Sequence, residues 1–388
     1  MGGRHPPEVG RTLPFLCDVL PFSRMIRTRR AGVLITLLAV VLGACGGTAA
    51  PSPSTTPSPS TAPATATATP KPAADKITFI FDFSAFGYWA PWYAGIQQGF
   101  FSDENIDVTL VPSQGSGDAA TKIGAGAAQF GLVDAITSVV AIASGTPITQ
   151  IASHWQSHVG GLCYIQGRKT INGFKDLEGL KIGSTAGNAY LLILPFLMQQ
   201  AGANPKGYTE VNIDASAATS ALLAGQIDAT PCGVSTLSSR TLAVKQQGQT
   251  MLFFAYAEHG LHALGHSIVV NNDLLKNKPD LVQRFLNAYA KSVVWSTLNQ
   301  DQAAAAYAIQ HPEQNAAGEK QNFTATLAYA VDTNATGTNG QFYMPPDKMK
   351  QSVDLANQAY QKAVDPTKAY TNDFVMKLPA ALRQGRLP

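Results

Sequence analysis

Short apolar segments alternate with helical segments along most of this chain, and this alternation limits the possible folds more than any other feature. Residues 77–81 and 106–111 have the pattern of strands, and a helix is expected between them at 91–101. Further segments typical of strands lie at 129–133, 148–152, 161–166, 180–183, 250–255 and 267–270, with helices expected at 118–126, 134–144, 188–201, 215–225 and 236–247. The pattern predicts an α/β fold with mostly parallel sheets and helices on both faces.

The body of the chain is too long for one comfortable hydrophobic core. It runs from Asp75 to Pro388, and a chain of this length usually divides into two lobes. Pro279 suits the first position of a helix, and the apolar residues after it repeat with helical spacing, at Leu281, Val282, Phe285, Leu286, Tyr289 and Val293. We expect this stripe to pack against a core.

The amino-terminal segment has the features of a secretory signal. Arg27, Arg29 and Arg30 precede an uncharged apolar run from Ala31 to Cys45, which is too short to span a bilayer stably. The residues Leu42-Gly43-Ala44-Cys45 resemble a bacterial lipobox, whose cysteine is acylated. We expect residues 1–44 to be a signal peptide, with the true start at Met25 an open alternative. An ordinary signal peptide with an incidental cysteine is the other interpretation.

The segment after Cys45 suits a tether. Residues 51–70 are only Pro, Ser, Thr and Ala, which favour extended chain and cannot form a core. We expect residues 45–74 to be a lipid anchor and disordered spacer. The leader's net charge of +4 exceeds the +3 of the whole chain, so the part from Cys45 onward carries −1. No basic surface for nucleic acid is therefore expected.

Two cysteines belong to the body of the chain, Cys163 and Cys232. A disulfide is permitted outside the cytoplasm, but two independent buried thiols are the expectation.

Several segments, in order, resemble type II periplasmic solute-binding proteins of ATP-driven (ABC) importers. The resemblance is to the branch that binds thiamine-pyrimidine precursors, riboflavin, aliphatic sulfonates and nitrate, and it covers about residues 77–310. It rests on 90–94 with 99–101, on 104–108, 129–135, 174–184 and 225–229, and on 277–282.

The resemblance implies a two-lobed fold whose hinge is two crossing strands. Lobe one would comprise residues 75–157 plus 266–388, and lobe two residues 158–265. A monomer would trap a small solute between the lobes, beyond the carboxyl ends of the strands, and deliver it to an ABC permease and its ATPase subunit outside the cytoplasmic membrane. With no large interface predicted between the lobes, we expect closure about the hinge.

The loop after the first strand is a candidate for solute contact because it is rich in aromatic residues. Phe83, Phe86, Tyr88 and Trp89 fall within seven residues, and flat rings suit a flat heteroaromatic solute. The alternative is that the rings cap the core of the lobe.

Two glycine-containing turns before helices are further candidates, since they expose backbone N–H groups at a helix N-terminus. They contribute Gln114 and Ser116 in lobe one, and Thr185, Gly187 and Asn188 in lobe two. Simple helix capping is the alternative. Asp134 follows a strand and would either accept from solute N–H groups or cap its own helix.

The crossings between lobes supply Trp155, Tyr256 and Glu258 as candidates, with solvated hinge residues as the alternative. His259, His262 and His266 have a spacing that would suit a metal on a helix. Gly260 and Gly265 make a helix there improbable, so no metal site is expected.

The sequence contains no nucleophile elbow, phosphate-binding lysine loop or metal-ligand motif. Fungal pyrimidine synthases of this fold carry a cysteine-rich motif, which is absent here. We therefore expect a solute-binding lipoprotein, neither an enzyme nor a cofactor-dependent protein. The candidate loops lack Arg and Lys; the nearest are Lys122, Arg168 and Arg240. This favours a neutral heteroaromatic solute, such as a thiamine pyrimidine precursor or riboflavin. An aliphatic sulfonate, taurine or nitrate is the alternative, as is an enzyme or a sensor that uses the same fold.

Overall fold

The computed structural model describes residues 73–330, 339–360 and 363–388, all within one compact unit of the chain, Thr69–Pro388. The predicted signal peptide at 1–44, the acylated Cys45 and nearly all of the predicted spacer at 45–74 lie outside the described residues. They stay predictions.

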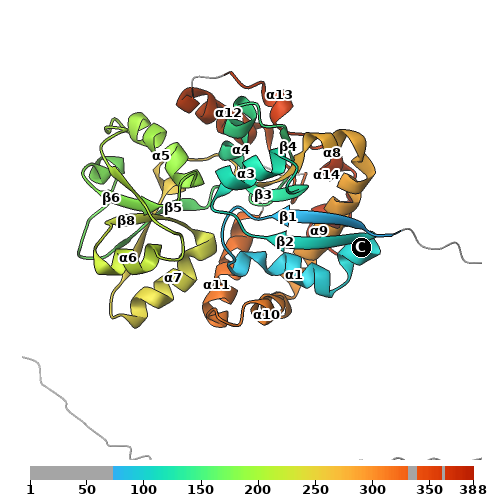
Figure 1. The fold of residues 1–388 in the computed structure, drawn as a ribbon, viewed down its shortest axis with the longest axis horizontal. Coiled ribbons are helices and arrows are strands. Elements are labelled where there is room, and N and C mark those ends of the chain that lie inside the picture. Colours follow the sequence, from blue (N-terminus) through green and yellow to red (C-terminus); the bar gives the residue numbers. More distant parts are fainter. Residues whose placement is uncertain (1–72, 331–338, 361–362) are drawn as a thin grey trace, which may run out of the picture. The chain divides into compact units, whose positions relative to one another are not determined.

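The strands form two separate five-stranded sheets (Figure 1). The first has the order β2-β1-β3-β10-β4, from β1 (Asp75–Ile80), β2 (Ile106–Val111), β3 (Phe130–Asp134), β4 (Ile148–Ser153) and β10 (His266–Asn271). The second has the order β7-β6-β8-β5-β9, from β5 (Gly160–Ile165), β6 (Lys181–Ser184), β7 (Thr209–Asn212), β8 (Ala229–Gly233) and β9 (Met251–Ala255).

Helices occupy most of the remaining chain. They are α1 (Ala90–Gln97), α2 (Phe100–Asp103), α3 (Ser116–Gly124), α4 (Ala135–Ala143), α5 (Ala189–Gln200), α6 (Ala218–Ala224), α7 (Val234–Gln246), α8 (Asn272–Asn277), α9 (Pro279–Leu298), α10 (Gln300–Gln310), α11 (Ala316–Thr326), α12 (Pro346–Tyr360), α13 (Pro366–Ala369), α14 (Asp373–Met376) and α15 (Ala380–Arg383). Short 3₁₀ turns are η1 (Gly87–Trp89), η2 (Phe174–Leu177), η3 (Tyr256–His259) and η4 (Leu327–Tyr329). Among these described segments, no helix is long and apolar enough to cross a membrane.

The chain passes between the sheets twice, through 154–159 and through 256–265. In each sheet the strand that follows a crossing runs against its neighbours: β5 is antiparallel to β8 and β9, and β10 to β3 and β4. The other paired strands, β1 with β2 and β3, and β6 with β7 and β8, are parallel. The predicted α/β fold with helices on both faces and mostly parallel sheets is confirmed.

The first sheet packs on a large aromatic core. Phe79 contacts Trp92 and Phe285, and Phe285 stacks on Phe130 with ring centroids 4.0 Å apart. The apolar stripe predicted after Pro279 is buried along α9, as its spacing indicated.

Two local predictions were wrong for identifiable reasons. The helix expected at 91–101 is broken at Gly99, whose φ of +80° ends α1 and begins α2. Strands β7 and β8 are both missing from the predicted segments. The sequence of β7, Thr-Glu-Val-Asn, is polar and mostly exposed, as an edge strand can be, and that of β8, Ala-Thr-Pro-Cys-Gly, contains Pro and Gly, which strands disfavour.

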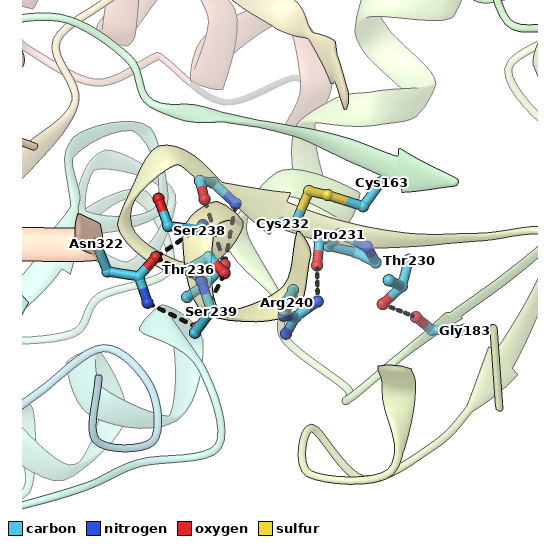
Figure 2. Close-up of a disulfide and its surroundings, with 11 residues drawn as sticks. Cys163, Gly183, Thr230, Pro231, Cys232, Thr236, Ser238, Ser239, Arg240 and Asn322 are labelled. Carbon is cyan, nitrogen blue, oxygen red and sulfur yellow. Dashed lines mark hydrogen bonds between the residues drawn. A yellow bond between two sulfur atoms is a disulfide. The ribbon is translucent and has the colours of Figure 1, made fainter. Parts of the chain in front are cut away.

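The carboxyl-terminal helices join the two sheets, contrary to the expectation of lobes without a large interface. Helix α11 packs along α7 of the second sheet and against η1 of the first. The buried Asn322 side chain on α11 accepts from the backbone N–H groups of Ser238 and Ser239 at 2.8 and 3.2 Å (Figure 2). Helix α12 contacts both α4 and α5.

The expectation of two independent thiols was also wrong. Strands β5 and β8 are antiparallel neighbours in which Gly161 faces Cys232 and Cys163 faces Thr230. This register brings the Cα atoms of Cys163 and Cys232 to 5.7 Å, and the two residues form a disulfide (Figure 2).

Candidate functional site

A small pocket of about 40 Å³, partly open to solvent, lies between loops of the two sheets. The first sheet and its loops supply Asp82, Phe83, Tyr88, Gly115, Ser116 and His266; the second supplies Asn188, Ala189, Tyr190, Pro231, Cys232, Gly233, Ser235, Thr236 and Arg240. Most of these residues lie at the carboxyl ends of strands or the starts of the helices that follow, where open α/β sheets bind ligands.

Asp82 is at the centre of the polar groups on the first-sheet side. One carboxylate oxygen accepts from the Tyr88 hydroxyl at 2.8 Å, and the other lies 2.9 Å from His266 Nε2. Burial lowers the pKa of His266, but the Asp82 carboxylate and Asp134 raise it by more, so it lies above 6.5. Burial and the charge of Asp82 raise the pKa of Tyr88 well above 10. The pair therefore offers a carboxylate acceptor beside a histidine that binds its proton more tightly than a free imidazole does.

The second-sheet side contains a buried cation, which corrects the expectation of a site without Arg or Lys. Arg240 is only 6% exposed and lines the pocket. Its Nη1 donates to the Pro231 carbonyl at 3.1 Å, at the end of β8 (Figure 2). Burial lowers the pKa of Arg240 to about 10, so the group stays charged at neutral pH.

The two predicted glycine turns meet each other at the mouth of the pocket. The Thr185 hydroxyl donates to the Gln114 carbonyl at 2.7 Å, and the Gly117 N–H donates to the Gly187 carbonyl at 3.3 Å. Gly115 has a φ of +149°, a backbone conformation that other residues rarely adopt, so this turn needs glycine. Ser116 and Asn188, predicted in the same turns, line the pocket.

Most predicted aromatic contacts lie elsewhere. Trp89 stacks on Phe81 with centroids 3.6 Å apart and is 2% exposed, so its ring belongs to the core. Trp155 and Tyr256 are equally buried. Phe86 packs against Phe83, with ring planes 9° apart. Of the aromatic residues predicted as candidates, Phe83 and Tyr88 line the pocket.

Gln114, Thr185 and Gly187 of the two turns lie outside the pocket lining, and so do Asp134 and Glu258. Asp134 is buried and accepts from the Thr137 N–H at 2.8 Å, so it caps α4, which was one of its two interpretations. Its second oxygen lies 3.4 Å from His158 Nε2. Glu258 is exposed at the second crossing.

Sequence reasoning missed the β8–α7 junction, which supplies Pro231, Cys232, Gly233, Ser235 and Thr236. The available signal was the position of Gly233 at the end of a strand and before a helix. Because ligands of open α/β sheets lie beyond the carboxyl ends of the strands, this junction was as good a candidate for solute contact as the two glycine turns. Tyr190 was missed because it lies inside the apolar sequence of α5.

Solved structures share this fold. The ligand-binding component of an ABC-type import system from Staphylococcus aureus, solved with zinc bound, superposes with a TM-score of 0.60 at 14% identity, over 79% of this chain and 99% of that one. The alkanesulfonate-binding protein SsuA from Xanthomonas axonopodis pv. citri, bound to MOPS, gives 0.58 at 14% identity, over 78% and 100%. These likenesses establish the periplasmic-binding-protein fold.

The family model described as NMT1/THI5 like matches residues 87–314, more than half of the chain. The chain belongs to the NMT1/THI5-like family. A Candida albicans member named 4-amino-5-hydroxymethyl-2-methylpyrimidine phosphate synthase is 26% identical over 272 residues, 67% of this chain and 75% of the relative. A Saccharomyces cerevisiae member with that name, THI13, is 27% identical over 229 residues, which span 57% of this chain and 66% of the relative.

These names correct the expectation that the chain is not an enzyme. Curated members of the NMT1/THI5-like family carry a synthase name, which the absence of familiar catalytic motifs had argued against. Motifs transfer poorly between families, so their absence was weak evidence. Within the described residues, no three His, Cys, Asp or Glu side chains gather in a way that could hold a metal ion.

Proposed function

We propose that this chain captures a small planar solute of the aminopyrimidine class in the pocket between its two sheets. The observation that carries the proposal is the pocket itself, which both sheets line with loops at strand ends. The name of the relatives supplies the solute class, since it specifies a 4-aminopyrimidine.

The polar groups of the pocket suit such a solute. An exocyclic amine would donate to Asp82, whose carboxylate already accepts from Tyr88 and lies beside His266. The ring would lie against Phe83, which is half-buried and lines the pocket. Phe83 would therefore take the stacking role that the sequence suggested for Trp89, because the ring of Phe83 is accessible from the pocket.

We further propose that the solute is passed to an ABC permease outside the cytoplasmic membrane. The names of the structural neighbours support an import role, and the lipobox-like residues before Cys45 support an anchored protein. Cleavage after residue 44, acylation of Cys45 and a spacer to residue 74 complete this arrangement.

Catalysis in the same pocket is a second candidate, and the relatives' synthase name favours it. Tyr88, Asp82 and His266 form a continuous hydrogen-bonded path that could move a proton at a bound ring. Capture and catalysis would use the same pocket. They differ in whether the protein releases the solute unchanged or as a reaction product.

A titration with 4-amino-5-hydroxymethyl-2-methylpyrimidine tests the proposal. Wild type should bind it, and Asp82→Asn should weaken binding by roughly tenfold or more, the worth of a hydrogen bond to a charged group. Asp107→Asn, on an exposed residue of β2, is the matched control and should leave affinity unchanged. If Asp82→Asn and wild type bound the pyrimidine with equal affinity, this pocket would be excluded as its binding site. Mass spectrometry of the recovered ligand separates capture from turnover.

A further inference from the structure

Helix α11 contacts both walls of the pocket but does not line it. On the first-sheet side, the Gly87 N–H donates to Glu319 Oε2 at 2.6 Å. On the second-sheet side, Asn322 Oδ1 accepts from the N–H groups of Ser238 and Ser239 in α7 (Figure 2). Asn322 Nδ2 donates to the same Glu319 oxygen at 3.1 Å. A continuous series of hydrogen bonds therefore runs from a loop of the first sheet, through α11, to a helix of the second.

Both ends of this series lie among residues that line the pocket. The loop 82–88, which contains Gly87, supplies three lining residues of the first-sheet side. Residues 238–239 lie between Thr236 and Arg240, two lining residues of α7. The series of hydrogen bonds therefore joins the two segments whose separation sets the width of the pocket.

The segment that begins α11 lies close against the loop of the first sheet. A side chain on Gly87 would overlap the backbone carbonyl of Glu319, so only glycine allows this approach. Just before α11, Gln314 Nε2 donates to the Ala85 carbonyl at 3.0 Å. The loop is thus held from the same segment at two points, two residues apart.

Glu319 is an unusual residue for this interior position. It is only 4% exposed, and within the part of the chain that the structure describes no Lys or Arg forms an ion pair with it. Burial raises the pKa of its carboxyl group above the ordinary value, while hydrogen bonds from Asn322 and Gly87 oppose that rise. Burying a carboxyl group without a counter-charge is costly, which favours a role beyond packing.

We propose that Glu319 and Asn322 are positioning residues for solute capture, which hold the loop 82–88 and helix α7 at one separation without touching the solute. This inference rests on the proposed function and deepens it, because it assigns the geometry of the two pocket walls to a helix outside the pocket. The Glu319 carboxylate accepts from both sides on one oxygen, so the position of each wall depends on that of the other.

Two substitutions test this role by breaking the connection and then restoring it. Asn322→Asp replaces the donating amide by a second carboxylate beside Glu319, so the two side chains should repel each other. Position 322 can still accept from α7. The double variant Glu319→Gln/Asn322→Asp exchanges the two groups. Its glutamine can accept from the Gly87 N–H and donate to the new aspartate, so the connection should be restored.

Calorimetric titration of the purified full chain with 4-amino-5-hydroxymethyl-2-methylpyrimidine, at about pH 8 to keep carboxyl groups ionised, compares these proteins. Asn322→Asp should bind about tenfold more weakly than wild type, the worth of a hydrogen bond to a charged group. The double variant should recover most of that loss. Unchanged affinity in Asn322→Asp, or a double variant as weak as the single one, would overturn the inference. Gln321→Glu, which adds a charge at an exposed position of α11, is the control and should bind as wild type does.

Chemical denaturation of the same proteins separates positioning from simple support of the fold. A residue that only supports the fold would lower the free energy of unfolding and leave the affinity of the folded protein unchanged, and that result would overturn the inference. Glu319→Ala serves if Asn322→Asp does not fold. It removes the acceptor of both donors without adding a charge, so it should also weaken binding.

Hydrogen–deuterium exchange of the proteins without solute separates this inference from the proposed function. If wild type does not bind the pyrimidine, the proposed function fails, but the positioning of the two walls is still measurable. Exchange at 82–88 and 234–240 should be faster in Asn322→Asp than in wild type and should slow again in the double variant. Equal exchange in all three proteins would overturn the positioning role as well.

Discussion

Neighbouring aromatic residues in the loop after β1 have different roles because their rings face different surroundings. Trp89 lies in the core, sandwiched against Phe81, whereas Phe83 is half-buried at the pocket. Sequence alone could not distinguish the roles of Phe83 and Trp89, because both residues are large and apolar and they lie only six positions apart. Their difference arises from η1, which turns Trp89 inward beneath the first sheet's loops.

The two rings should therefore respond differently to truncation. Trp89→Ala should lower the free energy of unfolding by about 3–5 kcal/mol, the usual cost of removing a buried aromatic ring. Phe83→Ala should change unfolding little and weaken solute binding about tenfold, through lost stacking and lost apolar contact. Chemical denaturation and calorimetric titration of both variants check this. A stable Trp89→Ala protein that has lost affinity would restore Trp89 as the stacking residue.

The pair of Asp82 and His266 should make stability depend on pH. The pKa of His266 is raised above 6.5 in the folded chain, so the folded state holds this proton more tightly than the unfolded state. The resulting stabilisation is fully present below about pH 6.5 and is lost as pH rises through the folded pKa. Denaturation of wild type and His266→Gln from pH 5.5 to 9 measures it. The difference between the two proteins should shrink with rising pH; a difference that stays constant would contradict the assignment.

At the scale of elements, the β5–β8 pair is reinforced by the disulfide between Cys163 and Cys232, which closes a separation of 69 residues. In the chain-entropy model such a link contributes about 4 kcal/mol. The double variant Cys163→Ala/Cys232→Ala should lose most of that amount in chemical denaturation. Because Cys232 lines the pocket, the double variant should also bind the solute more weakly than wild type does. Unchanged unfolding with the double variant would show that the link adds nothing to stability.

The sequence predicted the elements well where burial leaves a clear apolar pattern, either a continuous run or a helical stripe. The runs that became β3, β5 and β10 are entirely buried and strongly apolar, and the stripe of α9 follows one helix face. It failed where tertiary position decides the outcome. Strand β7 is polar at an edge, and the register that joins Cys163 to Cys232 is a property of paired strands.

The candidate site was predicted less completely than the fold. Ser116 and Asn188 follow from their places at helix starts beyond strand ends, a rule that needs only the order of elements. Arg240 lies seven residues into α7, and only the three-dimensional path of its side chain brings it back to the end of β8. No spacing in the sequence reports that path.

At the scale of the whole molecule, the contacts between the sheets are of three kinds. Those between the two glycine turns beside the pocket are few hydrogen bonds. Helices α11 and α7 pack over a buried asparagine, and α12 packs against both α4 and α5. Entry of a solute requires the mouth to part. We expect α11 and the two crossings to stay in place as the hinge while the turns at Gln114 and Thr185 separate.

Membrane attachment is a separate prediction for the whole chain. Cys45→Ala should move the protein from the membrane fraction to the soluble fraction, because the acyl anchor needs that thiol. A Cys17→Ala variant is the matched control and should stay with the membrane. Retention of Cys45→Ala after washing without detergent would contradict the anchor.

Hydrogen–deuterium exchange with and without 4-amino-5-hydroxymethyl-2-methylpyrimidine tests the central claim, capture between the two sheets, most directly. Bound solute should slow exchange together in the first-sheet loops at 82–88 and 115–116 and in the second-sheet segments at 188–190 and 233–240, which contain the pocket-lining residues. Protection confined to one sheet, or found only away from these segments, would contradict capture between the sheets.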